Sequence, residues 1–341
     1  MDFMNLSKAA RWNWDDIVND VKEDDFNKKD FLIPVKNISM DKNRIITDQF
    51  EAIMNDWAAT QLFTKLGMPG RYFKNKLATD PDSSLVQDHV NHNLRILREA
   101  DNTSSLLFRN RMGNGNNIIR AFLSDKYTVF DNQHLVDILT DILHKHTSDF
   151  KIVLWDVNDA SFNLRVVFPK LTRNIGKTLD GKDDTHIVGV HISNSEVGKK
   201  CVEINGIIWR LICTNGLASV YKENSFVQRH IYLNHNEMFN RVAHAIGSSI
   251  KVGASMVDEI IKAKAKPITD PFDIIDKLAS GETFSQKFVE DVKTNWSVEP
   301  ENNVYGIVNA FTRTARDIGD ADKRFEIEQF AGKVMNNLLT A

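Results

Sequence analysis

Residues 184–219, DTHIVGVHISNSEVGKKCVEINGIIWRLICTNGLAS, contain the pattern that decides the fold of this chain. Valine, isoleucine and tryptophan dominate two runs, 186–193 and 201–213, and polar residues interrupt both runs at roughly every second position. This alternation is typical of half-buried β-strands. The polar turn 194–198 joins the two runs, and a polar corner at 213–216 ends the second run. We therefore expect a hairpin of two long strands with a structural corner behind it.

The neighbouring segments extend this β region and then change to helix. Runs 151–157 and 161–168 predict another hairpin, and apolar residues at helical spacing over 236–266 predict a long amphipathic helix that stops at Pro267. Further helices are expected at 48–66, 83–100, 133–146, 303–316 and 320–339, with two more starting near 270 and 283, and further strands at 105–109 and 118–123. Helices, then a mostly antiparallel sheet, then helices predict an α+β fold.

Three regions follow from this order. We expect an α+β core over 46–270, in which the long helix packs on a central antiparallel hairpin sheet, and a helical region over 271–341 that packs on the core. Residues 1–45 are acidic at their start, with Trp12 and Trp14 expected to be exposed. This segment is predicted to be a solvated face or tail, and the alternative is a partner-binding or DNA-mimicking segment.

The composition sets broad limits on function. The chain has 341 residues, 42% of them hydrophobic and 26% charged, and a net charge of −3, so nothing marks the whole protein as basic. A local basic region remains possible. Cys201 and Cys213 would lie roughly 40 Å apart along one extended strand, too far for a disulfide, which favours a reducing, cytoplasmic setting. We expect no signal peptide and no membrane-spanning segment.

Four short elements resemble those of one protein family. They are LGMPGRYF at 66–73, LSDKY at 123–127 with DN at 131–132, NSEVG at 194–198 with RLICTNG at 210–216, and VYGIVNAFT at 304–312. In this order they resemble the phage- and plasmid-encoded family catalogued as domain of unknown function 932, over about residues 55–335. Tyr305 stands where that family pattern has tryptophan. The resemblance implies a phage or plasmid setting, and it brings no reaction and no catalytic residues.

A second resemblance concerns architecture. Hairpins at 150–168 and 186–213 followed by a helix at 236–266 are similar to the core of ring-forming single-strand annealing proteins of the RecT, Redβ and Erf types. This likeness rests on the order of elements and is a fold analogy. It implies DNA annealing by a homo-oligomer.

The loop 109–117, RNRMGNGNN, is the best candidate for binding phosphate. Arg109 and Arg111 supply charge, and small residues with exposed backbone N–H groups let a phosphate backbone come close. No Gly-Lys-Ser/Thr follows, so this is not a Walker A loop. The alternative is an ordinary flexible hairpin loop.

A local excess of positive charge supports binding to a nucleic-acid strand. Residues 151–266 hold 16 Lys or Arg against 11 Asp or Glu. Such a field can follow a single strand, although ordinary solvated charge is an equal explanation. The candidate side chains in and around the predicted sheet are Lys170, Arg173, Lys177, Lys199 and Lys200.

Aromatic side chains near these charges are candidates for stacking on bases. Tyr72 is expected at the surface because Arg71 and Lys74 flank it. Trp209 lies within an apolar strand, where core packing is the favoured interpretation. The other candidates are Phe73, Phe108 and Tyr127.

No catalytic or metal-binding motif is convincing. Two histidine pairs lack further ligands at a recognisable spacing, one carboxylate pair is explained by turn chemistry, and two potential nucleophiles lack a base. These residues are His89 with His92, His144 with His146, Asp156 with Asp159, and Ser195 and Cys213.

The sequence thus predicts a phage or plasmid protein that binds single-stranded DNA and anneals strands in recombination or replication. The alternative is a host-interaction or counter-defence protein of a mobile element, and a nuclease is the third possibility. We expect single-stranded DNA and a second copy of the chain as partners, with no cofactor, no metal and no membrane.

Overall fold

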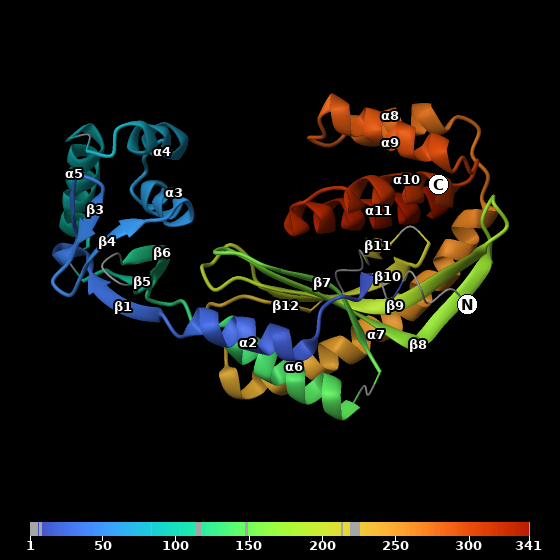
Figure 1. The fold of residues 1–341 in the computed structure, drawn as a ribbon. Coiled ribbons are helices and arrows are strands. Elements are labelled where there is room, and N and C mark those ends of the chain that lie inside the picture. The colour runs from blue at the N-terminus through green and yellow to red at the C-terminus, as the bar shows by residue number, and fades with distance from the viewer. Residues whose placement is uncertain are drawn as a thin grey trace.

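The computed structural model describes residues 6, 9–82, 84–101, 103–113, 117–146, 149–212, 214–218 and 226–340 (Figure 1). Its strands are β1 Lys28–Pro34, β2 Ser39–Asp41, β3 Arg44–Ile46, β4 Glu51–Met54, β5 Ser105–Arg111, β6 Ile118–Ser124, β7 Lys151–Val157, β8 Phe162–Lys177, β9 Asp183–Asn194, β10 Val202–Arg210, β11 Asn215–Ala218 and β12 Phe226–Gln228. Its helices are α2 Trp14–Asp25, η1 Val35–Asn37, α3 Asp56–Lys65, α4 Gly70–Thr79, α5 Ser84–Ala100, α6 Asn132–His146, α7 His235–Ala265, α8 Pro271–Ser280, α9 Gln286–Val298, α10 Val304–Arg316 and α11 Ala321–Thr340.

The predicted α+β class is confirmed, but the strands form two sheets where one central sheet was expected. The first sheet has the order β1-β5-β6-β4-β3-β2, and the second has the order β11-β10-β9-β8-β7, with β12 paired to β10. Helices α3, α4 and α5 lie with the first sheet at one end of the molecule (Figure 1). Helices α8 to α11 lie at the other end of the molecule, and all four are on one side of the second sheet.

The first sheet contains the clearest error of the sequence prediction. A single helix was expected over 48–66, but its first part is strand β4, which pairs in parallel with β6. The helix α3 begins only at Asp56, where the side chain of Asn55 accepts a hydrogen bond from the Ala58 N–H at 2.8 Å. The expected strands at 105–109 and 118–123 are confirmed as the antiparallel pair β5 and β6.

The second sheet follows the predicted hairpins closely. Strands β9 and β10 pair in antiparallel register from His186 with Arg210 to Ser193 with Glu203. Strand β10 ends at Arg210, the chain reverses at Thr214 with a φ of 51°, and β11 then pairs back onto β10. The predicted corner is thus confirmed as a reversal between two paired strands, while Cys213 itself lies outside the described residues.

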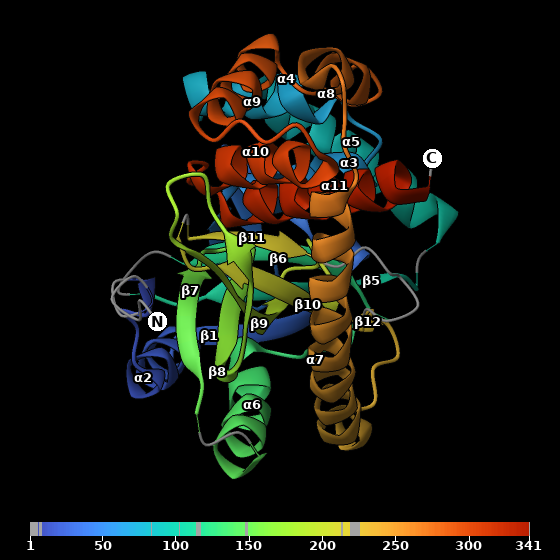
Figure 2. The ribbon, with the colours of Figure 1, turned by 90° about the vertical axis from the view of Figure 1, so that its right-hand side faces the viewer.

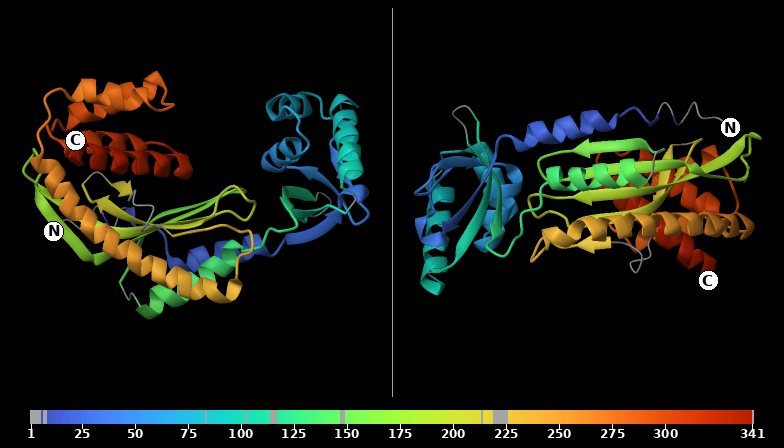
Figure 3. Two further views of the ribbon diagram at one scale, coloured as in Figure 1. Left: turned by 180° about the vertical axis from the view of Figure 1, so that it is seen from behind. Right: turned by 90° about the horizontal axis from the view of Figure 1, so that it is seen from below.

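The two faces of the second sheet differ in polarity because successive side chains point to opposite sides. One face is apolar and is covered by α2, α6 and α7 (Figure 3, right). The other face presents Asn163, Arg165 and His191, and α11 covers these buried polar groups. The long α7 extends along the sheet from the level of α6 to that of α11 (Figure 2).

The start of the chain is part of the core. Trp14 was expected to be exposed, and this is wrong: it is 5% exposed, and its indole N–H donates to Thr140 Oγ1 on α6 at 3.0 Å. Ile17 and Val21 bury the same face of α2, and β1 then joins the first sheet. Among the described residues, every helix is too short or too polar to cross a membrane.

Candidate functional site

The turn 194–198 between β9 and β10 lies where the two sheets meet. The Glu196 carboxylate is buried and contacts Lys28 Nζ at 2.8 Å and Arg120 Nη2 at 2.7 Å. Its backbone carbonyl accepts a hydrogen bond from Arg109 Nη1 at 2.7 Å. Burial alone would raise the pKa of Glu196, but the charges of Lys28 and Arg120 outweigh it and hold that pKa at about 2. Glu196 is therefore a structural anion that ties the turn to the first sheet.

The rest of the turn is held by side chains near α3 and β6. The Val197 carbonyl accepts hydrogen bonds from Trp57 Nε1 at 2.9 Å and Gln61 Nε2 at 2.8 Å. The Tyr127 hydroxyl donates to the Ser195 carbonyl at 3.0 Å, and burial raises the pKa of this hydroxyl. These contacts fix α3 opposite the residues that follow the turn.

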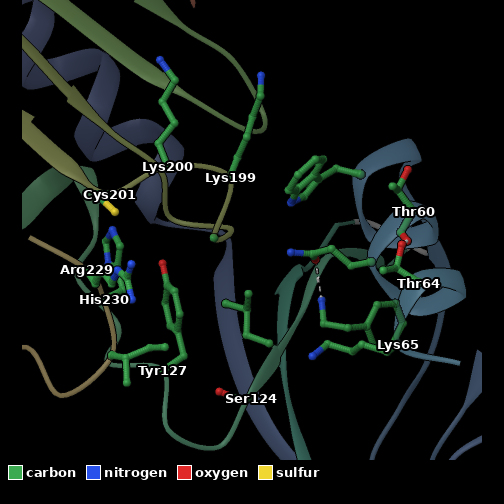
Figure 4. A pocket seen from close by; sticks show the side chains of 16 residues that line it. Thr60, Thr64, Lys65, Ser124, Tyr127, Lys199, Lys200, Cys201, Arg229 and His230 are labelled. Atoms are coloured by element: carbon green, nitrogen blue, oxygen red, sulfur yellow. Dashed lines mark hydrogen bonds between the residues drawn. The ribbon is translucent and has the colours of Figure 1, made fainter. Parts of the chain in front are cut away.

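A cavity of about 560 Å³, called here the interface cavity, opens between α3 and residues 198–201. Figure 4 shows α3 on one side, and the turn with the segment before α7 on the other. The α3 side contributes Thr60, Thr64 and Lys65, and the facing side contributes Lys199, Lys200 and Arg229. Its volume lies within the range of ordinary ligand sites.

The charge of the interface cavity comes from four cationic side chains. Lys199 and Lys200 form ion pairs with Asp322 at 2.9 and 2.5 Å. No described residue forms an ion pair with Lys65 or Arg229. Partial burial lowers the pKa of Lys65. An anionic group in this cavity would be attracted by Lys65 and Arg229, which have no ion pair with a described residue. It would be attracted less by Lys199 and Lys200, which share the Asp322 carboxylate.

His230 adds a buried polar group to the same wall. Its ring is 4% exposed and is stacked on Tyr127, with the centroids 4.9 Å apart and the planes 8° from parallel. Neither ring nitrogen has a hydrogen-bond partner within the described part of the chain. Burial lowers the pKa of His230 to about 4, so the ring is neutral at pH 7. A buried and unpartnered group of this kind suits a ligand that completes its hydrogen bonds.

A second polar cluster joins β9, β10 and α10. Arg210 is buried against Asp184 and Glu299, with Nε 2.7 Å from Asp184 Oδ1. Asn215 donates to Thr312 Oγ1 at 2.6 Å. The Tyr305 hydroxyl and His186 Nε2 lie 3.2 Å apart. These groups bond one another in the core, although Asn215 Oδ1 has no hydrogen-bond partner among the described residues, and the cluster fixes the C-terminal helices to the sheet.

The family model of the domain of unknown function DUF932 matches residues 121–312, more than half of the chain. The chain belongs to the DUF932 family. Searches of curated proteins and of solved structures each gave no significant match. The DUF932 match extends from β6 to α10, so it includes the turn at 194–198 and the Arg210 cluster but leaves the LGMPGRYF element at 66–73 outside.

Both Arg109 and Arg111 lie outside the interface cavity. Arg109 was expected to bind phosphate, but it is 1% exposed, and its guanidinium contacts Asp30 at 3.0 Å and Asp131 at 2.6 Å. Arg111 forms ion pairs with Asp24 and Asp159. The structure therefore gives Arg109 a structural role in the DUF932 fold. Residues 114–116 of the predicted loop lie outside the described residues.

The remaining predicted residues fall into three places. Lys199 and Lys200 line the interface cavity. The outer part of the β8–β9 hairpin has the exposed Lys170, Arg173 and Lys177, and helix α4 has Arg71, the exposed Tyr72 and Lys74, whose ammonium binds Asp56. Among the aromatic candidates, Tyr127 lines the cavity, whereas Phe73, Phe108 and Trp209 are buried.

Sequence reasoning missed Lys65, Arg229 and His230. No local motif distinguishes them, because Lys65 lies far in the sequence from Arg229 and His230, and the three meet only in the folded chain. Within the described ranges, no three His, Cys, Asp or Glu side chains lie close enough together to hold a metal ion. The Ser195 hydroxyl donates to the Ala160 carbonyl at 2.7 Å, a turn-stabilising bond.

Proposed function

We propose that this chain is a phage or plasmid protein that binds single-stranded DNA at the interface cavity. The observation that carries the proposal is that Lys65, Lys199, Lys200 and Arg229 all line one cavity. Lysine and arginine side chains that neutralise phosphates supply most of the sequence-independent affinity for nucleic acid. Two of the four cations, Lys65 and Arg229, form no ion pair with a described residue, which leaves them available for phosphate.

The surroundings of these cations suit an unpaired strand. Trp57 and Tyr127 line the same cavity, and aromatic rings beside a basic groove stack on bases without regard to sequence. Neither ring nitrogen of His230 has a hydrogen-bond partner within the described part of the chain, so both match donors and acceptors on a sugar. A cavity of about 560 Å³ has room for a small part of an unpaired strand.

Annealing is the extension of this proposal. A protein that holds the backbone leaves base edges open for pairing, and a homo-oligomer would present a row of such cavities to one strand. The measurement is the rate at which two complementary oligonucleotides pair with and without the protein. A rate unchanged by the protein would restrict the function to strand binding.

The main test measures the fluorescence anisotropy of a labelled single-stranded oligonucleotide across a salt titration, with a duplex of equal length in parallel. We expect tight binding that prefers the single strand. In the K65E/R229E variant the slope of log K against log salt should become shallower by about 1.4, since each phosphate contact to a single strand contributes roughly 0.7.

The matched control is K36E/K251E, which makes the same change of charge at two exposed lysines outside the cavity. This variant should keep most of the affinity. Absence of binding by the wild-type protein at low salt would refute strand binding. Equal losses in both double variants would refute the assignment to the interface cavity.

The alternative is a host-interaction or counter-defence protein, and it was motivated by exposure of Trp12 and Trp14. The structure weakens that motive, because Trp14 is buried against α6. Deleting residues 1–30 would remove α2 and part of β1 from the core, so it cannot separate the two functions. A D15K/D16K variant alters only exposed side chains of α2, and host-protein capture that survives it would exclude this surface.

A further inference from the structure

A second cavity, called here the tryptophan cavity, lies on the other side of the first turn of α11. Its volume is about 480 Å³, and β7, the end of β10 and the link between α10 and α11 line it. Three of the six tryptophans and three arginines meet there: Trp12, Trp155, Trp209, Arg11, Arg316 and Arg324. Asp322 connects the two cavities. It binds Lys199 and Lys200 of the interface cavity, and its neighbours Ala321 and Arg324 on α11 line the tryptophan cavity.

Trp209 gives this cavity an unused hydrogen-bond donor. Its side chain is 4% exposed, and its indole N–H has no acceptor within the described residues. A buried N–H without a partner is unfavourable, because folding removes it from water and returns no hydrogen bond. An acceptor on a bound molecule would satisfy it.

The arginines give the cavity an anion-binding side. The Arg11 guanidinium lies over the Trp12 ring, 4.9 Å from its centroid, and forms no ion pair with a described residue. Arg316 binds Asp317 at 2.8 Å, and Arg324 donates to the Ile318 carbonyl at 2.7 Å, so both guanidiniums are held in place. Guanidinium groups recognise phosphate through paired N–H donors and also stack on flat rings.

Among the described residues that line the cavity, Asp156 is the one carboxylate, and Asp317 lies beside it as the ion-pair partner of Arg316. Like charge keeps a phosphate away from Asp156 and directs it to Arg11 and to the N–H donors of Arg316 that face away from Asp317. The Asp156 carboxylate in turn suits the N–H donors at the edge of a nucleobase. Aromatic walls, a cationic end and an acceptor end together match a molecule with a flat base and a phosphate.

We propose that the tryptophan cavity binds a nucleotide, with its base stacked against Trp12 and its phosphate held by Arg11 and Arg316. The Trp209 N–H then donates to an acceptor on the base or sugar. The source is either a free mononucleotide or the phosphorylated end of a strand, which share this chemistry. The site stands apart from strand binding at the interface cavity.

The test is isothermal titration of the full chain with AMP, GMP, adenosine and inorganic phosphate, and with an oligonucleotide carrying or lacking a 5′-phosphate. We expect the nucleotide or the phosphorylated oligonucleotide to bind at least tenfold more tightly than adenosine or phosphate. If only the phosphorylated oligonucleotide binds, the source is a strand end. Saturable binding by neither would overturn the proposal.

Variants assign the binding to the cavity. R11A/R316A should weaken the nucleotide at least tenfold, and W209F, which keeps a ring but removes the N–H, should weaken it several-fold. The matched controls are R44A/R95A and W296F, whose residues lie outside the cavity. If R11A/R316A fails to fold, R11K/R316K keeps the charge and loses only the paired donors. Affinities equal to those of the controls would overturn the assignment.

The two proposals fail separately. K65E/R229E should lose strand affinity and keep nucleotide affinity, and R11A/R316A should do the reverse. If both variants lower both affinities equally, the tryptophan cavity is not a distinct site.

Discussion

Arg165 Nη1 on β8 lies 2.8 Å from Glu328 Oε1 on α11, and a second bond joins the other nitrogen and oxygen of this pair. Both side chains are excluded from solvent. The pair fastens the last helix to the polar face of the second sheet. A paired charge in such a place costs much less than the same charge left alone.

Replacing Glu328 by Gln should therefore destabilise the chain strongly. The change leaves the Arg165 guanidinium buried without its counter-ion, which costs about 3–5 kcal/mol in the free energy of unfolding. Urea denaturation measures this loss. Glu326→Gln, an exposed change on the same helix, serves as the control. Equal midpoints for the two variants would contradict the prediction.

Arg109→Met should lower stability and leave strand binding intact. The guanidinium neutralises Asp30 and Asp131 inside the protein, so its removal should cost about 3–5 kcal/mol. Arg111→Met, at a more exposed pair, should cost about 0–1 kcal/mol. Thermal unfolding and oligonucleotide affinity are measured on the same preparations. A folded Arg109→Met protein with weakened strand binding would restore Arg109 to the binding surface.

Acid should destabilise the protein in two stages. Burial lowers the pKa of His186 and of His230 from 6.5 to about 4, so the unfolded chain binds these protons first. Stability is complete above pH 6.5 and falls as the pH drops towards 4, by on the order of 3 kcal/mol for each ring. Glu196, with a pKa lowered from 4.5 to about 2, adds a loss only below pH 4.5.

Melting temperatures at pH 8, 6.5, 5 and 4 check the first stage. His230→Phe keeps a ring stacked on Tyr127 and removes one titrating group, so its melting temperature should fall less over this range. The same fall in both proteins would show that His230 does not contribute to the acid response.

Two glycine substitutions should have opposite signs. A Cβ at Gly206 on β10 would lie 2.4 Å from the Ser249 carbonyl oxygen of α7, a backbone atom that can move only with its helix. Gly206→Ala should cost about 1–3 kcal/mol through overpacking. Gly247→Ala places a methyl group in open space on the same α7 and should stabilise by roughly 0.5–1 kcal/mol. Denaturant midpoints that move in the same direction would contradict this.

Sequence patterns correctly predicted the helices and strands whose formation depends on interactions between residues a few positions apart. The β9–β10 pair, the long α7 and helix α10, capped by Asn303, match their expected ranges because strand alternation, helical spacing and capping residues act within a few positions. Segment 48–66 misled because Phe50, Ile53 and Trp57 also fit helical spacing. What makes β4 a strand is its pairing with β3 on one side and with β6, far along the sequence, on the other.

The site was less predictable for the same reason. Lys199 and Lys200 adjoin a conspicuous turn, so sequence reasoning reached them. The hydrogen bonds that fix α3 to the Val197 carbonyl place Lys65 opposite them, and Arg229 comes from the segment between β12 and α7. Arg109 showed the opposite error, since composition indicates charge but not whether that charge already has a partner inside the protein.

The turn at 194–198 has a consequence for how the chain unfolds. Side chains from the first sheet and from α3 donate hydrogen bonds to its carbonyl groups and its carboxylate. The two strands that flank the turn belong to the second sheet. Neither sheet can open at this point without exposing a charge that the other neutralises. We therefore expect the two sheets to unfold as one cooperative unit, although each has a hydrophobic core of its own.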